Sequence, residues 1–256
     1  MNLDKFYTKE EVAKQCISMV DNINDYSYIV EPSAGCGNFS KQLNCIAYDI
    51  LPEGDNIIQQ DYLLLKDKFP KHTLVIGNPP FGLRSSLAKK FIAHSIDLGA
   101  ETIAFILPDT FDKLSNQTVF PDNWRLILKH KLEGTNFILD NQDYYVPCSF
   151  YIWTRQSGEV NLREQKLEYT DLFTFLPRGD QRADFAINGN NGKVKDIKDI
   201  TNPKGEHYIY VNDRTKILKV REFFTNAVYD FKSSVNGNNA WLGQQDILKY
   251  FYYNYQ

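Results

Sequence analysis

The run EPSAGCGNF at residues 31–39 combines residue types that could hold a small ligand. It follows apolar residues 28–30, so it predicts a strand that enters a tight turn and then a helix. Gly35 and Gly37 allow backbone angles and a close approach of a ligand that any Cβ would obstruct. The run lacks the third glycine of the dinucleotide-binding fingerprint. It therefore predicts a ligand-binding turn without identifying the ligand.

Three carboxylates narrow the chemistry of that ligand. Glu31 ends the first predicted strand, Asp49 ends the second, and Asp61 follows shortly after. An acid after the second strand is placed to bind ribose hydroxyls, as in nucleotide sites generally. An acidic pocket poor in lysine would repel a pyrophosphate but suit a cationic sulfonium that carries an ammonium group. Taken singly, each aspartate could equally be a helix cap or a turn former.

The tetrapeptide Asn78-Pro79-Pro80-Phe81 ends a later apolar run, residues 75–77. Its two prolines fix φ and remove two backbone donors, leaving a stiff turn with outward carbonyl acceptors. The nitrogen of an aromatic amine is a poor nucleophile, because its lone pair is delocalised into the ring. Acceptors at the Asn78 side chain and the Pro79 carbonyl could align that lone pair with a sulfonium methyl. Phe81 could stack on the base.

These residues need a scaffold that brings strand ends together. From Asp25 to about Arg155 the sequence alternates short apolar runs with helical patterns, which is typical of a parallel α/β sheet. Strands are predicted at 28–30, 45–48, 73–77 and 102–107, and helices at 9–22, 39–43, 85–98 and, shorter, after Pro108. The runs at 124–132 and 150–154 predict a closing antiparallel hairpin. Open α/β sheets bind ligands at the carboxyl ends of their strands, which is where the two motifs lie.

The two motifs resemble the S-adenosylmethionine-dependent N6-adenine methyltransferases, in the arrangement where the cofactor motif precedes NPPF. The resemblance covers about residues 4–155 and implies a Rossmann-like methyltransferase sheet that is mostly parallel. It implies catalysis by Asn78, Pro79, Pro80 and Phe81, and no metal. The cofactor-binding residues that it implies are Tyr7, Thr8, Glu31, Pro32, Ser33, Ala34, Gly35, Gly37, Asn38, Phe39, Asp49, Asp61 and Tyr62.

Three further features follow from the same resemblance or lie beside its motifs. The segment Asp4–Thr8 is similar to the part that closes over the methionyl end of the cofactor, with Lys9 where the family often has Pro. Phe150 lies in a run similar to the strand motif that flanks the target base. Arg84, just after the catalytic turn, could neutralise a phosphate. The expected substrate contacts are therefore Phe81, Phe150 and Arg84.

Composition sets outer limits on function. The net charge of −3 argues against a protein that coats nucleic acid non-specifically, so phosphate contacts must come from local patches. The four cysteines show neither C-x-x-C spacing nor a neighbouring His cluster, which indicates no zinc site, no disulfide framework and a reducing compartment. The sequence has neither a signal peptide nor an apolar stretch of ~18 residues, so we expect a cytoplasmic protein that does not enter membranes.

The composition changes past Arg155, where Asn, Lys, Asp and Gly crowd residues 188–193 and 236–239. We expect a catalytic domain at 1–158 and a smaller α+β target-recognition region at 159–256. Basic residues gather at 178–198 and 214–221, but interleaved aspartates leave phosphate binding and a solvated surface equally open. The aromatic end at 250–255 is more typical of an amphipathic helix packed on this region than of a base-stacking surface.

The leading hypothesis is a site-specific DNA adenine-N6 methyltransferase, alone or with a restriction partner. RNA adenosine methylation uses the same chemistry and stays open, because the catalytic turn cannot read the sugar. Protein glutamine methylation is disfavoured mildly by Phe81, where such enzymes commonly have Tyr. Two hypotheses of a different class also stay open: the chain could be a subunit that needs a separate specificity partner, or a binding subunit without catalytic activity. The intact NPPF motif argues against a loss of catalytic activity.

Overall fold

The computed structural model describes residues 6–229 and 241–255. It divides into two compact units, the first ending at Glu164 and the second beginning at Gln165. The division falls within the composition change noted after Arg155 and six residues beyond the boundary expected at 158. Asp4, Lys5 and residues 236–239 lie outside the described residues. No helix within the described ranges is long and apolar enough to cross a membrane.

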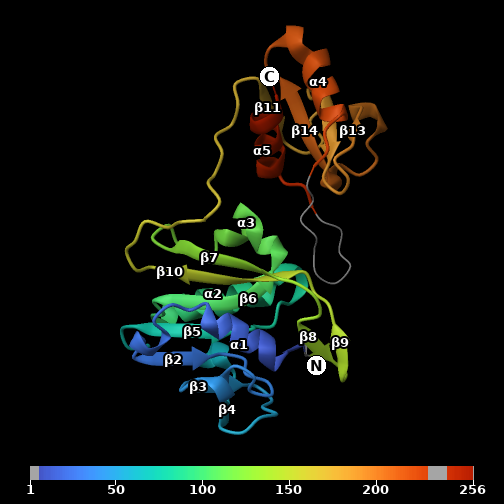
Figure 1. Ribbon diagram of the computed structural model, residues 1–256. Helices are drawn as coiled ribbons and strands as arrows, with labels where there is room; N and C mark the ends of the chain where they lie inside the picture. Colours follow the sequence, from blue (N-terminus) through green and yellow to red (C-terminus); the bar gives the residue numbers. More distant parts are fainter. Residues whose placement is uncertain (1–5, 230–240, 256) are drawn as a thin grey trace. The chain divides into compact units, whose positions relative to one another are not determined.

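The first unit is built on a seven-stranded sheet (Figure 1). Its order is β4-β3-β2-β5-β6-β10-β7. Neighbouring strands from β4 to β6 pair in parallel, whereas β10 pairs antiparallel with both β6 and β7. The strands are β2 (Tyr28–Glu31), β3 (Ile46–Asp49), β4 (Ile57–Gln59), β5 (Thr73–Gly77), β6 (Thr102–Pro108), β7 (Arg125–Leu132) and β10 (Cys148–Thr154). The expected mostly parallel, Rossmann-like sheet with an antiparallel closing pair is confirmed.

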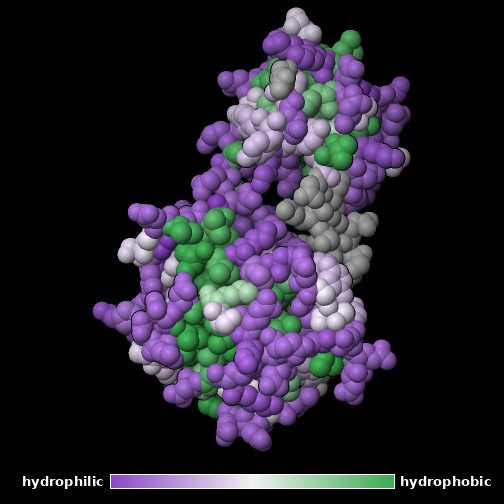
Figure 2. Space-filling model, viewed as in Figure 1, coloured by the Kyte–Doolittle hydropathy of each residue, from purple (hydrophilic) through white to green (hydrophobic). Residues whose placement is uncertain are grey.

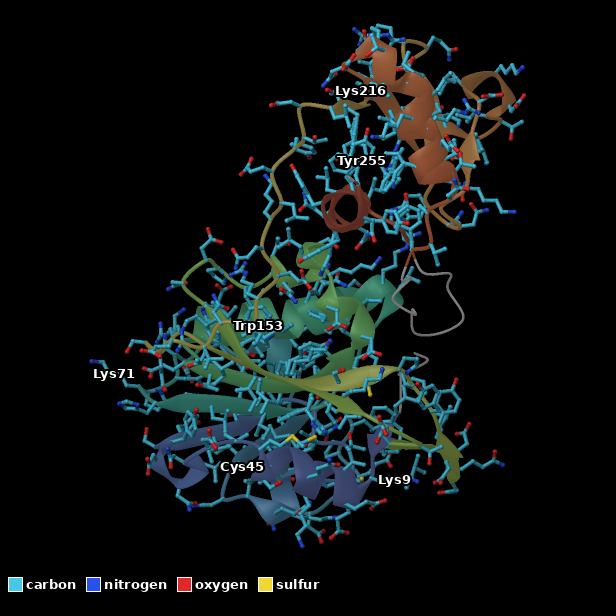
Figure 3. All side chains as sticks on the ribbon, turned by 45° about the horizontal axis from the view of Figure 1, so that its top comes forward. Lys9, Cys45, Lys71, Trp153, Lys216 and Tyr255 are labelled. Atoms are coloured by element: carbon cyan, nitrogen blue, oxygen red, sulfur yellow. The ribbon has the colours of Figure 1, made fainter. Side chains whose placement is uncertain are left out.

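Three strands of this sheet, β5, β6 and β10, are buried at every position. A strand that is covered on both faces of its sheet has no solvent-facing alternate residues, which explains the continuous apolar runs in the sequence. Trp153, labelled in Figure 3, lies in this core and stacks on Phe120 with ring centroids 4.1 Å apart. The predicted strand at 45–48 and the one at 150–154 are correct within two residues. The short edge strand β4 was not predicted.

The helices differ more from expectation than the strands do. Helix α1 (Glu10–Ser18) ends four residues before the predicted end at 22, and Asn22 adopts a left-handed φ of 50°. The predicted helix at 39–43 is a single 3-10 turn, η2 (Ser40–Gln42). Helix α2 (Ser86–Leu98) matches its prediction and is ended by Gly99. The remaining helical turns of this unit are η1 (Ile23–Asp25), η3 (Tyr62–Leu64), η4 (Leu83–Ser85), η5 (Asp109–Asp112) and α3 (Leu114–Gln117).

A second, small sheet joins distant parts of the first unit. Strand β1 (Tyr7–Thr8) pairs antiparallel with β8 (Phe137–Leu139), which pairs with β9 (Gln142–Tyr144). Asp140 and Asn141 link β8 to β9, and both have positive φ, as a two-residue hairpin turn requires. The sequence did not predict this sheet, because β1 and its partner β8 lie about 130 residues apart in the chain.

The second unit has its own antiparallel sheet, in the order β11-β14-β12-β13, and its own aromatic core around Phe173, Phe224 and Phe251. Its elements are β11 (Phe173–Leu176), β12 (Phe185–Asn188), β13 (Val194–Lys195), η6 (Ile197–Asp199), η7 (Pro203–Gly205), β14 (Glu206–Val211), η8 (Arg214–Lys216), α4 (Ile217–Thr225) and α5 (Gln244–Asn254). Helix α5 contains most of the aromatic end and packs Phe251 inward, so the amphipathic-helix interpretation is correct. On the face drawn in Figure 2, both units are covered mainly by hydrophilic residues, with one apolar band on the first unit.

Candidate active site

A cavity of about 500 Å³ lies at the carboxyl ends of β2, β3 and β5. All four residues of the NPPF turn line it. From the predicted cofactor set, the lining residues are Tyr7, Thr8, Glu31, Pro32, Ser33, Ala34, Gly35, Asn38, Phe39, Asp49, Asp61 and Tyr62. The fold therefore gathers the two sequence motifs and the three carboxylates around one space.

Three predicted residues are absent from the described lining of the cavity. Gly37 lies within the glycine turn and has a φ of +85°, which L side chains rarely adopt, so the turn needs glycine here for its backbone conformation. Phe150 is fully buried in the middle of β10, between Ile106 of β6 and His130 of β7. Its place in the strand core corrects the expectation that it stacks on a target base. Arg84 is exposed and lies in η4, the 3-10 turn that follows the NPPF turn in the sequence.

The glycine turn is held against β3 by a carboxylate. Asp49 accepts the backbone N–H of Gly35 through Oδ2 at 2.7 Å and that of Leu51 through Oδ1 at 2.8 Å. Gly35 has φ of +54°, and a Cβ there would come 2.9 Å from the Tyr7 ring. Asp49 thus shapes the turn as well as lining the cavity.

The charged side chains in the described lining of the cavity are all acidic. Glu31, Asp49 and Asp61 line it, and its described lining contains neither lysine nor arginine. Glu31 is only 2% exposed, and one of its oxygens, Oε2, has no hydrogen-bond partner among the described residues. Burial raises the pKa of Glu31 to about 7; hydrogen bonds from Ser40 oppose this, and the charge of Asp49 adds to it. A cation bound here would offset the cost of ionising Glu31.

Asn78 is held at two points and keeps one acceptor free. Its backbone carbonyl accepts the Ser33 hydroxyl at 3.1 Å, and its side-chain N–H donates to the Phe6 carbonyl at 3.1 Å. The Oδ1 atom is buried and has no hydrogen-bond partner among the described residues. An unsatisfied buried acceptor costs about 1–3 kcal/mol, which an incoming amine would recover.

Buried aromatic side chains line the cavity, and two of them, Tyr62 and Phe91, pack against each other. Tyr62 is 1% exposed, stacks on Phe91 with centroids 5.5 Å apart and shares a hydrogen bond with Ser95 at 2.8 Å. Phe81 is also almost fully buried. Tyr62 and Phe81 both border the cavity, and the bordering part of each ring could contact a flat ligand.

The sequence reasoning missed part of the lining. Leu87 and Phe91 lie one helical turn apart on α2, a spacing that could have revealed them. Ile50 and Leu51 directly follow Asp49 and offer apolar contact to a ring beside the carboxylate. The other missed lining residues are Phe6, Cys36, Leu63 and Gly82.

The cavity residues fit S-adenosylmethionine chemically. Carboxylates suit ribose hydroxyls and the ammonium and sulfonium charges, while apolar side chains suit the adenine ring. When bound, that cofactor would supply a transferable methyl group. The residues that would hold it are the glycine turn with Glu31, Asp49 and Asp61.

Five basic residues in the two clusters of the second unit are paired with carboxylates. Lys195 pairs with Glu206 at 2.7 Å and Arg214 with Asp184 at 2.6 Å. Three more pairs follow the same pattern: Arg182–Asp180, Lys216–Asp213 and Arg221–Asp196. Of the two interpretations of these charges, the ion pairs favour a solvated surface over a phosphate-binding patch.

Comparison with known proteins identifies a family. The family model described as the EDM2 methyltransferase-like domain matches residues 11–169. The protein ENHANCED DOWNY MILDEW 2 of Arabidopsis thaliana is 26% identical over 199 residues, which cover 71% of this chain. The match spans only 14% of that longer relative.

Solved structures of several methyltransferases are also similar. PH1948 of Pyrococcus horikoshii, described as a candidate RNA methyltransferase, is 14% identical, with 59% of this chain and 87% of that chain covered and a TM-score of 0.46. Magnesium protoporphyrin IX methyltransferase of Synechocystis is 12% identical, with 57% and 77% covered and a TM-score of 0.40. The restriction-modification enzyme MmeI is 10% identical, with 72% and 41% covered and a TM-score of 0.37.

Proposed function

Because the chain belongs to the family of the EDM2 methyltransferase-like domain, we propose that it is an S-adenosylmethionine-dependent methyltransferase acting on the N6 amino group of adenine in DNA. The observation that carries this proposal is the Asn78 Oδ1 acceptor, which has no hydrogen-bond partner among the described residues and lies beside a cavity lined by three carboxylates. The acidic lining supports a cationic cofactor. The free amide oxygen supports an amine as the methyl acceptor.

In the proposed reaction, Asn78 Oδ1 and the Pro79 carbonyl each accept one hydrogen of the target amine. These two bonds would aim the nitrogen lone pair at the sulfonium methyl of the bound cofactor, so catalysis rests on alignment and preorganised hydrogen bonds. The nitrogen would take the methyl group from the sulfonium, which becomes a neutral thioether, and would release one of its hydrogens to solvent as a proton. Pro79 and Pro80 stiffen the turn, which fixes the direction of its acceptors. Phe81 borders the cavity and packs against the base.

The substrate of this chain is proposed as a flipped adenine held near Arg84. The Arg84 side chain is exposed, and we propose that it contacts a phosphate of the substrate. The second unit, from Gln165 on, is proposed to contribute target recognition. RNA adenine is the alternative substrate, since the acceptors touch only the base. A separate specificity partner is the alternative if the chain alone is inactive.

The deciding experiment measures transfer of labelled methyl from S-adenosylmethionine to duplex DNA, single-stranded DNA and RNA, with nucleoside analysis of the product. We expect N6-methyladenine in DNA. Asn78→Ala should lower transfer at least about a hundredfold, the scale found when one preorganised catalytic hydrogen-bonding group is removed. Its dissociation constant for S-adenosylmethionine should stay within about threefold of wild type, because Asn78 is proposed to act on the target amine.

Four other results would change the proposed substrate, the need for a partner or the role of Asn78. N6-methyladenine only in RNA would replace DNA as the substrate. Methylated glutamine in an added protein substrate would replace adenine altogether. Cofactor binding without transfer to any nucleic acid would point to a missing partner, and an equal loss of binding and transfer in Asn78→Ala would remove the proposed role of that residue.

A further inference from the structure

The orientation of the Asn78 side chain depends on a single backbone group. The Phe6 carbonyl can only accept hydrogen bonds, so the Asn78 atom that lies 3.1 Å from it must be the NH₂ nitrogen. The amide oxygen then points the other way, and this is the Oδ1 atom without a partner among the described residues. Displacing the Phe6 carbonyl would remove the contact that selects this orientation.

Phe6 is in turn held by the small sheet. Strand β1 follows it directly and pairs with β8 through Tyr7–Ile138 and Thr8–Phe137. The Phe6 ring packs on Tyr144, at the end of β9, with ring centroids 5.2 Å apart. The β8–β9 hairpin therefore sets where the Phe6 carbonyl lies.

Lys9 fastens the other end of β1 to the same hairpin region. Its backbone N–H donates to the Asn136 carbonyl at 3.0 Å. Its ammonium donates to Thr135 Oγ1 at 3.2 Å and pairs with Asp143 at 2.8 Å. Figure 3 shows Lys9 beside this hairpin. A proline at this position could make none of these bonds, because it has neither a backbone N–H nor a cationic side chain.

We propose that Lys9 and the β8–β9 hairpin form a strap that holds the Phe6 carbonyl against the Asn78 amide. Phe6 is then a positioning residue: its carbonyl turns Asn78 Oδ1 toward the target amine. The inference rests on the proposed function for its catalytic meaning. It also links the two sides of the site, because Tyr7 and Thr8 of the same strand line the cofactor cavity.

The test replaces Lys9 by proline. Lys9 has φ of −61° and ψ of 148°, which a proline adopts without strain, so Lys9→Pro removes the fastening bonds and not the backbone conformation. Two quantities are measured: kcat with the nucleic acid that wild type methylates, and solvent exchange of the Asn78 side-chain N–H, assigned by its disappearance in Asn78→Ala. We expect kcat to fall at least about tenfold, as small misplacements of reacting groups do. The N–H exchange should accelerate at least about tenfold, a conservative figure for losing a buried hydrogen bond.

Two matched variants separate the strap from general effects. Lys9→Arg keeps the backbone N–H and the positive charge. Its kcat and its Asn78 side-chain N–H exchange rate should therefore equal those of wild type. Lys14→Met removes a lysine from the exposed side of α1 and should change neither. If Lys9→Pro does not fold, Tyr144→Ala tests the strap through a different contact, the packing of the Phe6 ring on Tyr144, with Tyr145→Ala as its neighbour control.

The outcomes for the strap and for the proposed function can be told apart. Unchanged kcat and unchanged Asn78 exchange in folded Lys9→Pro would overturn the strap. A wild-type protein that methylates protein glutamine and none of the three nucleic acids would overturn the proposed function, and the Asn78 exchange rate would still decide on the strap.

Discussion

Glu31 shows how one buried side chain can make the cavity sensitive to pH. Burial raises its pKa to about 7, so the free protein carries a mixture of neutral and ionised Glu31 near neutral pH. A cationic ligand favours the ionised form, and its binding therefore lowers the pKa. Affinity for such a ligand rises as the pH increases through 7 and is lost as the pH falls below it.

We therefore predict that S-adenosylmethionine binds roughly eightfold more tightly at pH 7.5 than at pH 6.0, the ratio of ionised Glu31 expected for a pKa near 7. Isothermal titration calorimetry at the two pH values measures the difference. Glu31→Gln cannot ionise, so it should bind weakly and almost independently of pH. If the variant keeps the wild-type pH dependence, another group is responsible.

At the level of elements, the glycine turn and Tyr7 of β1 fit closely together. Gly35 has a positive φ, and a methyl group there would come 2.9 Å from the Tyr7 ring. A non-glycine residue in this conformation costs about 1–2 kcal/mol before any clash is counted. Either the turn or the Tyr7 ring must shift to admit a side chain.

Gly35→Ala should thus weaken S-adenosylmethionine binding at least about tenfold, which corresponds to about 1.4 kcal/mol. Gly179→Ala is the matched control, since Gly179 also has a positive φ of 84° but an added Cβ would meet nothing within 4 Å. Both variants should lose some thermal stability, and only Gly35→Ala should lose affinity. Equal affinities in the two variants would show that the contact with Tyr7 is unimportant.

Over the whole molecule, two separate cores imply two separate stabilities. The cavity and its lining belong to the first unit. Phe173, 1% exposed, makes edge contacts with Phe224 and Phe251 in the core of the second unit. A ligand that binds one unit stabilises that unit by mass action.

Phe173→Ala should lower the free energy of unfolding of the second unit by about 3–5 kcal/mol, the usual cost of a large buried cavity. The S-adenosylmethionine dissociation constant should not change. Differential scanning calorimetry should show an early transition that the ligand does not shift and a later one that it does. One cooperative transition that shifts with ligand would mean that the two units unfold together.

The sequence by itself determined the features that adjacent residues encode. The glycine turn, the stiff NPPF turn and the buried strands each follow from the backbone chemistry and apolar content of a few neighbouring residues, and the carboxyl-end rule for parallel strands then brings the two turns together. This accounts for the sheet and for most of the cavity lining.

Tertiary structure alone decided the features that depend on distant pairing. The β1–β8 pairing joins residues about 130 positions apart, and no local pattern marks it. Phe150 belongs to a strand with both faces covered, so its sequence cannot tell whether it lines a cavity or fills the core. The direction of the Asn78 amide is also a tertiary property, because it is set by the carbonyl of Phe6, which only the folded chain brings within hydrogen-bond distance.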